Sequence, residues 1–145
     1  AWPAKGRVAP GRTRTNDQER RRTMIDFDNK GFFKLKQNDE YADKVSALLV
    51  DGEEIIDSYK SFRDGVVFTN KRIIAVNVQG ITGSKKAYTS LPYKEIEAYS
   101  GETAGTFDLD SELEVYVSAV GKVRFEFTGS TAIVEISKYI SSNVL

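Results

Sequence analysis

Two apolar runs separated by only two residues constrain the fold of this chain more than any other feature. The runs Val66–Thr69 and Arg72–Val78 flank the dipeptide Asn70-Lys71. Asparagine tolerates the left-handed φ that a two-residue hairpin turn requires. Such a turn brings apolar residues together on both faces of the two strands, pairing Phe68 with Ile73 and Val67 with Ile74. The sequence therefore predicts a tight antiparallel hairpin, and with it a fold built on antiparallel sheet.

Further short strands are predicted around this hairpin, at Glu54–Phe62, Lys85–Thr89, Ile96–Glu102, Leu113–Val117 and Val123–Phe127. The last two alternate apolar and polar residues, which is typical of strands with one buried face. Their apolar residues match when Val117 pairs with Val123, Val115 with Phe125, and Leu113 with Phe127. This register places Tyr116 beside Arg124 and requires a left-handed φ at Gly121 in the connecting turn.

Two amphipathic helices complete the expected fold. The first begins at Asn38 or Asp39, ends at Gly52, and places on one face Tyr41, Val45, Leu48 and Leu49. The second begins at Ser130 or Thr131 and carries an apolar stripe of Ile133, Ile136, Ile140 and Val144. We therefore predict a mainly β domain: a seven-stranded antiparallel barrel or sandwich with an N-terminal helix and a C-terminal capping helix.

Charge divides the 145 residues into two segments, 1–23 and 24–145. Residues 1–23 have a net charge of +5, contain Pro3 and Pro10, and lack any apolar period, so we predict a disordered basic leader. Because Met24 follows it directly, we interpret the leader as an expression-derived or read-through segment and 24–145 as the domain. The alternative is a basic arm that contacts phosphates or acidic lipid. The domain has a net charge of −5, which gives no reason to expect nucleic acid as its main partner.

The chain contains neither cysteine nor histidine. The first absence excludes disulfides, thiolate metal sites and cysteine nucleophiles, and the second excludes a Ser-His-Asp triad and histidine-ligated zinc. We therefore expect no enzymatic activity, no metal and no cofactor. The apolar runs are far shorter than the roughly 20 residues of a membrane-spanning helix, and no secretory signal is visible, so we expect a cytoplasmic protein.

Five segments carry a family resemblance: Asp51–Ile56, Phe68–Val76, Ser90–Tyr93, Glu102–Asp110 and Val123–Ser130. Through them, residues 24–145 resemble the bacterial pleckstrin-homology-like family. The resemblance implies seven strands in two near-orthogonal sheets, a C-terminal helix, and no enzymatic activity. It also implies an oligomerising interaction module whose single-domain members form cyclic rings, commonly pentamers. Some relatives carry a C-terminal helical hairpin and form larger rings, and this sequence shows none, so the smaller ring is expected.

The predicted contact surface combines a hairpin tip with an acidic strand. Four carboxylates recur at every second position, so a strand places on one face Asp108, Asp110, Glu112 and Glu114. The basic tip, expected near Lys85 and Lys86, is predicted to meet the acidic face of a neighbouring subunit. The predicted subunit and partner contacts are Thr69, Asn70, Lys71, Arg72, Thr103, Thr106, Asp108 and Asp110. The alternatives are a solvated, edge-protecting acidic face and a tip that needs only turn residues.

A phospholipid headgroup site between the first two predicted strands is the alternative function. Lys60 and Arg63 lie in that segment, with Asp64 beside them. Two cations next to a carboxylate form a poor site for several phosphates, and the negative domain opposes binding to anionic membranes. Membrane binding is therefore the less favoured prediction, behind binding to another protein.

Overall fold

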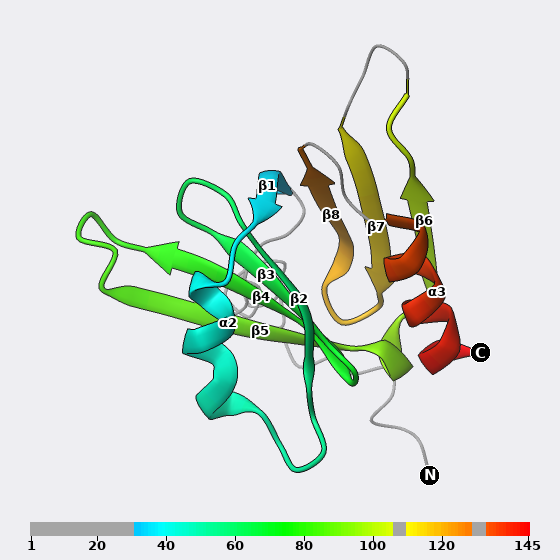
Figure 1. The fold of residues 1–145 in the computed structure, drawn as a ribbon, viewed down its shortest axis with the longest axis horizontal. Coiled ribbons are helices and arrows are strands. Elements are labelled where there is room, and N and C mark those ends of the chain that lie inside the picture. Colours follow the sequence, from blue (N-terminus) through cyan, green and yellow to red (C-terminus); the bar gives the residue numbers. More distant parts are fainter. Residues whose placement is uncertain (1–30, 106–109, 129–132) are drawn as a thin grey trace, which may run out of the picture.

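A single curled sheet of eight strands forms the body of the fold (Figure 1). The computed structural model describes residues 31–105, 110–128 and 133–145. The elements are β1 (Phe32–Gln37), α2 (Glu40–Val45), η2 (Ser46–Leu48), β2 (Ile55–Lys60), β3 (Gly65–Thr69), β4 (Arg72–Gln79), β5 (Lys85–Pro92), η3 (Tyr93–Glu95), β6 (Ala98–Glu102), β7 (Ser111–Val117), β8 (Gly121–Phe127) and α3 (Ile133–Val144). In space the strands follow the order β5-β4-β3-β2-β1-β8-β7-β6, so β5 and β6 are the two edges.

The mainly β fold with two helices is confirmed, but the predicted count of seven strands is wrong. The seven predicted strands correspond to β2–β8, and β1 is the eighth. It lies between β2 and β8, antiparallel to the first and parallel to the second. Its buried residues, Phe32 and Leu35, are three apart, and Lys34 has a left-handed φ of +57°. This irregular spacing removes the alternation by which the other strands are recognised.

The concave side of the sheet contains the main hydrophobic core. Phe125 and Phe127 lie at its centre, and the ring of Phe32 stacks on Phe125 at a centroid distance of 5.2 Å. α3 covers one end of this core with three buried isoleucines, Ile133, Ile136 and Ile140. The predicted apolar stripe of the C-terminal helix is thus confirmed, whereas its predicted start at Ser130 or Thr131 lies outside the described residues.

A smaller apolar cluster lies on the opposite face of β3 and β4, beneath α2. Tyr41 and Val45 of the helix are buried against Val67, Ile74 and Val76. Because both faces of β3 are covered, all five of its residues are buried. α2 is shorter than the predicted helix. The Asn38 side chain accepts a hydrogen bond from the backbone N–H of Glu40, and Leu48 lies 43% exposed in η2.

The two predicted hairpin registers have different outcomes. In the β3–β4 hairpin Phe68 pairs with Ile73 and Val67 with Ile74, as predicted. In the β7–β8 hairpin the prediction is wrong by two residues, because the observed pairs are Val115 with Val123, Leu113 with Phe125 and Ser111 with Phe127. A shift of two keeps every side chain on the same face, so alternation cannot distinguish the registers. Tyr116 therefore lies opposite Lys122, and Arg124 opposite Glu114.

Candidate functional site

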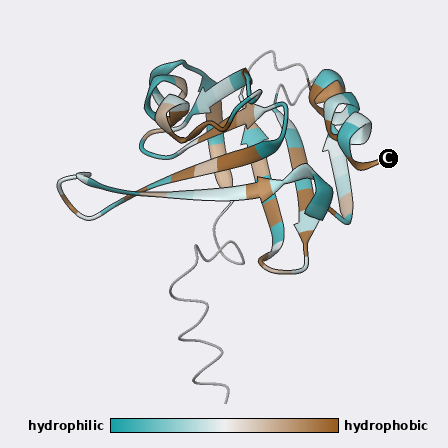
Figure 2. Ribbon diagram, turned by 90° about the horizontal axis from the view of Figure 1, so that it is seen from below, coloured by the Kyte–Doolittle hydropathy of each residue, from teal (hydrophilic) through white to brown (hydrophobic). Residues whose placement is uncertain are grey.

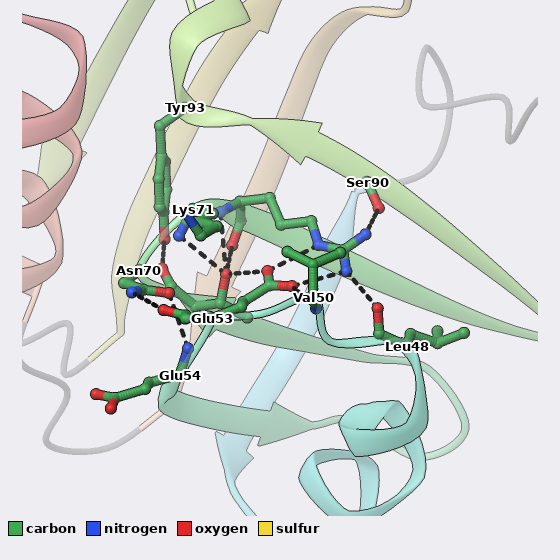
Figure 3. Close-up of polar contacts among 11 residues, drawn as sticks. Leu48, Val50, Glu53, Glu54, Asn70, Lys71, Ser90 and Tyr93 are labelled. Carbon is green, nitrogen blue, oxygen red and sulfur yellow. Dashed lines mark hydrogen bonds and ion pairs between the residues drawn. The ribbon is translucent and has the colours of Figure 1, made fainter.

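The tip of the β3–β4 hairpin is hydrogen-bonded to the loop segment that precedes β2 (Figure 3). Asn70 uses both ends of its amide, accepting from the backbone N–H of Glu54 at 2.8 Å and donating to the Gly52 carbonyl at 2.9 Å. The Thr69 hydroxyl accepts from the backbone N–H groups of Lys71 and Arg72. These contacts hold the two-residue turn in one conformation.

A paired carboxylate and guanidinium lie beneath this tip. The Glu53 side chain is fully buried, and its two oxygens accept from Arg72 Nε at 2.8 Å and Arg72 Nη2 at 2.9 Å. The Thr69 hydroxyl donates to the same carboxylate at 2.7 Å. Arg72 also donates to the Leu48 carbonyl and the Ser90 hydroxyl, both at 2.8 Å. Five segments of chain therefore meet at this ion pair.

The electrostatics of the pair match its geometry. Hydrogen bonds from Arg72 lower the pKa of Glu53 to about 2, against the opposing effect of burial. Next to the pair, the Tyr93 hydroxyl donates to the Thr69 carbonyl at 2.7 Å, and burial raises the pKa of Tyr93. A charged, permanently paired carboxylate of this kind has no free lone pair directed to solvent, so the arrangement joins segments of chain and offers no acid or base.

The structure separates the predicted contact residues into two groups. Thr69, Asn70 and Arg72 are engaged in the internal contacts above, and Lys71 is exposed. The prediction that the tip lies near Lys85 and Lys86 is wrong. Arg72 pairs with Pro92, whereas Lys85 pairs with Gln79 at the far end of β4. Thr103 is exposed and Asp110 half-buried beside β6 and β7, and the strands β2, β1 and β8 lie between β3 and β7 in the sheet. Thr106 and Asp108 lie outside the described residues.

The outward side of β6, β7 and β8 carries four carboxylates and two cations, which we call the acidic face: Glu102, Glu112, Glu114, Glu126, Lys122 and Arg124. Glu112 and Glu114 lie on one side of β7, as their alternation predicts. Arg124 forms an ion pair with Glu112 and lies 3.6 Å from a Glu114 oxygen. Glu102, on the edge strand, lies opposite Glu112. The acidic face thus retains an excess of two negative charges.

Lys60 and Arg63, the alternative lipid ligands, are both engaged within the chain. Lys60 forms an ion pair with Glu40 and lies over the Tyr41 ring at 5.7 Å from its centroid. Arg63 donates to the Gly80 carbonyl, which joins the β2–β3 turn to the β4–β5 hairpin. Figures 1 and 2 show this hairpin extending away from the rest of the fold. Two apolar side chains that sequence analysis missed are exposed on these two turns: Phe62 at 94% and Ile81 completely.

A groove of about 380 Å³ between β6 and α3 was also missed by sequence analysis. Its lining includes Tyr99 and Gly101 of the strand and Val134, Ser137 and Lys138 of the helix. The strand and the helix approach closely at Gly101, where an added Cβ would lie 2.6 Å from the Ser137 hydroxyl oxygen. Finding this groove requires the packing of α3 on β6, which no local pattern encodes.

Neither a metal centre nor a membrane span is found in the part of the chain that the structure describes. Within residues 31–105, 110–128 and 133–145, no three metal-ligating side chains of Asp or Glu lie close enough to hold an ion. None of the helices over these same ranges is long and apolar enough to cross a lipid bilayer.

Comparison with known proteins identifies the family. Residues 27–144 match the family model described as "Bacterial PH domain". The chain is 41% identical over 102 residues to YjqA of Bacillus subtilis, an uncharacterized protein, covering 69% of this chain and 82% of YjqA. It is 38% identical to a DUF1696 family protein with a pleckstrin-homology domain from Shewanella loihica, with a TM-score of 0.66, 78% of this chain and 99% of that structure covered.

A second solved structure leads to the same conclusion. The pleckstrin homology domain from Shewanella amazonensis is 40% identical, with a TM-score of 0.54, and the match covers 81% of this chain and 93% of that one. None of these matches indicates a catalytic family. From the matched length, the identities and the shared fold, we conclude that this chain belongs to the bacterial pleckstrin-homology domain family.

Proposed function

We propose that this chain is a non-catalytic, cytoplasmic interaction module that assembles into a cyclic homo-oligomer, most favourably a pentamer, and presents a hydrophilic surface to a protein partner. The observation that carries the proposal is the charge at the two ends of the sheet. β5, at one end, carries Lys85 and Lys86, and the acidic face occupies β6–β8 at the other.

A ring requires two different, complementary patches on each subunit, because every contact is head to tail. Patches at opposite ends of one sheet meet this requirement, since a subunit can receive one neighbour on each side. Complementary charges also set the orientation of such contacts and suppress alternatives. We therefore place the lysines of β5 against the acidic face of the next subunit, whose carboxylates continue in the sequence to Asp108 and Asp110.

Charge reversal tests the assembly. The native mass of the full chain, measured at low micromolar concentration, should be a closed multiple near five subunits. The Lys85→Glu/Lys86→Glu variant and the Asp108→Lys/Asp110→Lys variant should each lose the ring, because the first places like charges at every contact and the second removes the net negative charge that attracts the lysines of β5.

The matched control is Lys44→Glu/Lys94→Glu, which makes the same change in net charge at two exposed lysines outside both patches. This control should retain the wild-type mass. A monomeric wild-type protein, or a ring that survives both reversals, would contradict the proposed assembly.

Membrane binding is the second candidate, and the exposed Phe62 and Ile81 favour it. Two apolar side chains on adjacent turns, with Lys85 and Lys86 nearby in the same hairpin, are the features of a weak interfacial anchor. If this function operates, the protein should sediment with vesicles that contain phosphatidylserine, less so at high salt, and the Phe62→Asp/Ile81→Asp variant should not. Vesicle binding that persists unchanged in this variant, or that is absent in the wild type, would contradict it.

A further inference from the structure

Of the two sheet edges, β6 is the less protected against pairing with another chain. β5 ends in Pro92, which lacks a backbone donor, and carries Lys85 and Lys86, both typical devices against edge pairing. β6 has neither proline nor lysine, and four of its five residues are exposed. It pairs with β7 on one side only. Among residues 31–105, 110–128 and 133–145 no strand pairs with the other side of β6, so its backbone groups are available there to an extended segment.

The groove beside this edge gives an added strand a place for its side chains. α3 runs along the inner side of β6, where Tyr99 bonds to Ser141 and Gly101 packs on Ser137. A strand added to β6 would direct every second side chain toward α3. The side chains that α3 contributes to the groove change from apolar to charged along the helix. Val134, 55% exposed, lies toward one end of the groove and Lys138 toward the other.

Charge determines which peptide fits. Lys138 is the single charged side chain among the described residues that line the groove, and it is exposed. It therefore favours a peptide that places a carboxylate beside Lys138 and an apolar side chain beside Val134. These two peptide residues are two positions apart, because alternate residues of a strand lie about 7 Å apart. The intervening residue faces away from α3, on the side of Glu102 and the rest of the acidic face, which favours lysine or arginine there.

We propose that β6 and α3 bind an extended peptide of a partner protein by β-strand addition, with an apolar and an acidic residue two positions apart directed into the groove. Backbone hydrogen bonds to an edge strand supply affinity, and the pockets for alternate side chains supply specificity. The inference rests on the proposed function in naming its protein partner. It uses the edge of β6 and meets the acidic face only at its margin, beside Glu102.

Two fluorescein-labelled heptapeptides test the two strand directions, with binding followed by fluorescence anisotropy. The first has valine at position three and glutamate at position five, and the second has these exchanged. Both have lysine at position four and threonine elsewhere. One of them should bind the full chain, and the Lys138→Glu variant should weaken that binding at least about tenfold. The same variant should prefer the peptide in which lysine replaces glutamate.

Lys44→Glu is the matched control, since Lys44 is an exposed lysine of α2, outside both the groove and the acidic face, and its loss should leave peptide affinity unchanged. N-methylation tests the backbone contacts. One peptide is N-methylated at positions three and five, and another at positions two, four and six. Only one of the two should lose binding, because alternate N–H groups of an added strand face β6. Failure of both peptides to bind, indifference to both methylated sets, or unchanged affinity of Lys138→Glu would each overturn the inference.

These outcomes are separable from those of the assembly. A ring that forms but binds neither peptide overturns the groove inference alone. Peptide binding by a monomeric chain overturns the proposed ring and supports the groove inference.

Discussion

Replacing Arg72 with methionine should lower the free energy of unfolding by about 3–5 kcal/mol, because it leaves a buried carboxylate without its partner. Glu53 is fully buried and receives both of its charged hydrogen bonds from Arg72. The variant also removes the donors to the Leu48 carbonyl and the Ser90 hydroxyl. Urea unfolding at neutral pH measures the effect, provided that the slope with urea concentration is unchanged.

Lys71→Met is the matched control, because it removes one positive charge from the preceding residue, which is exposed. Its expected effect lies within about 0.5 kcal/mol. Glu53→Gln combined with Arg72→Met should be less destabilised than Arg72→Met alone, since the buried negative charge is then gone. Equal stabilities for Arg72→Met and Lys71→Met would show that the ion pair contributes little to the fold.

The ion pair explains why the tip carries its particular residues. A bare two-residue turn needs only Asn70 for its conformation. Here Thr69 and Arg72, on either side, both bind Glu53, and Asn70 binds the backbone on either side of it, at Gly52 and Glu54. The segments Asp51–Ile56 and Phe68–Val76, which carry part of the family resemblance, are therefore in contact with each other. Much of that resemblance reflects this structural joint, so it is weak evidence that Thr69, Asn70 and Arg72 contact a partner.

The parts of the fold that sequence analysis predicts are those governed by local rules. The β3–β4 register follows from a two-residue turn with apolar residues matched on both faces. The stripe of α3 follows from helical spacing. The family resemblance supplies the arrangement of these pieces, which alternation alone does not determine.

What sequence analysis misses depends on contacts between distant segments. β1 is not predicted because Lys34 interrupts its alternation. Its pairing with β8 also joins residues about 90 positions apart in the sequence. Glu53, the partner of Arg72, is 19 residues away in the sequence. The local pattern therefore suggests an exposed basic tip, whereas the structure pairs this arginine with a buried carboxylate. The β7–β8 register fails because Gly121 begins the strand, opposite Val117, and the turn precedes it. In each case tertiary packing decides between options that the local pattern leaves equal.

The stability of the domain should fall by about 3 kcal/mol through Glu53 alone as the pH drops from about 4.5 to about 2. The pKa of this carboxyl is lowered in the folded chain, so the unfolded chain takes up the proton first on acidification. The contribution is therefore complete above the unfolded pKa and is lost as pH falls toward the folded one.

Comparing the wild type with Glu53→Gln isolates this contribution, because glutamine imitates the protonated carboxyl. The difference in free energy of unfolding between the two proteins should be constant above pH 5 and should shrink steadily below it. Glu54→Gln, at an exposed neighbour, should instead follow the wild type in parallel at every pH. Should the wild-type and Glu53→Gln curves also run parallel down to pH 2, the pKa of the Glu53 carboxyl would have to be the same in the folded and unfolded chains, as for a solvated carboxyl. The buried pair with Arg72 would then not be the joint that holds the hairpin tip to the loop segment before β2.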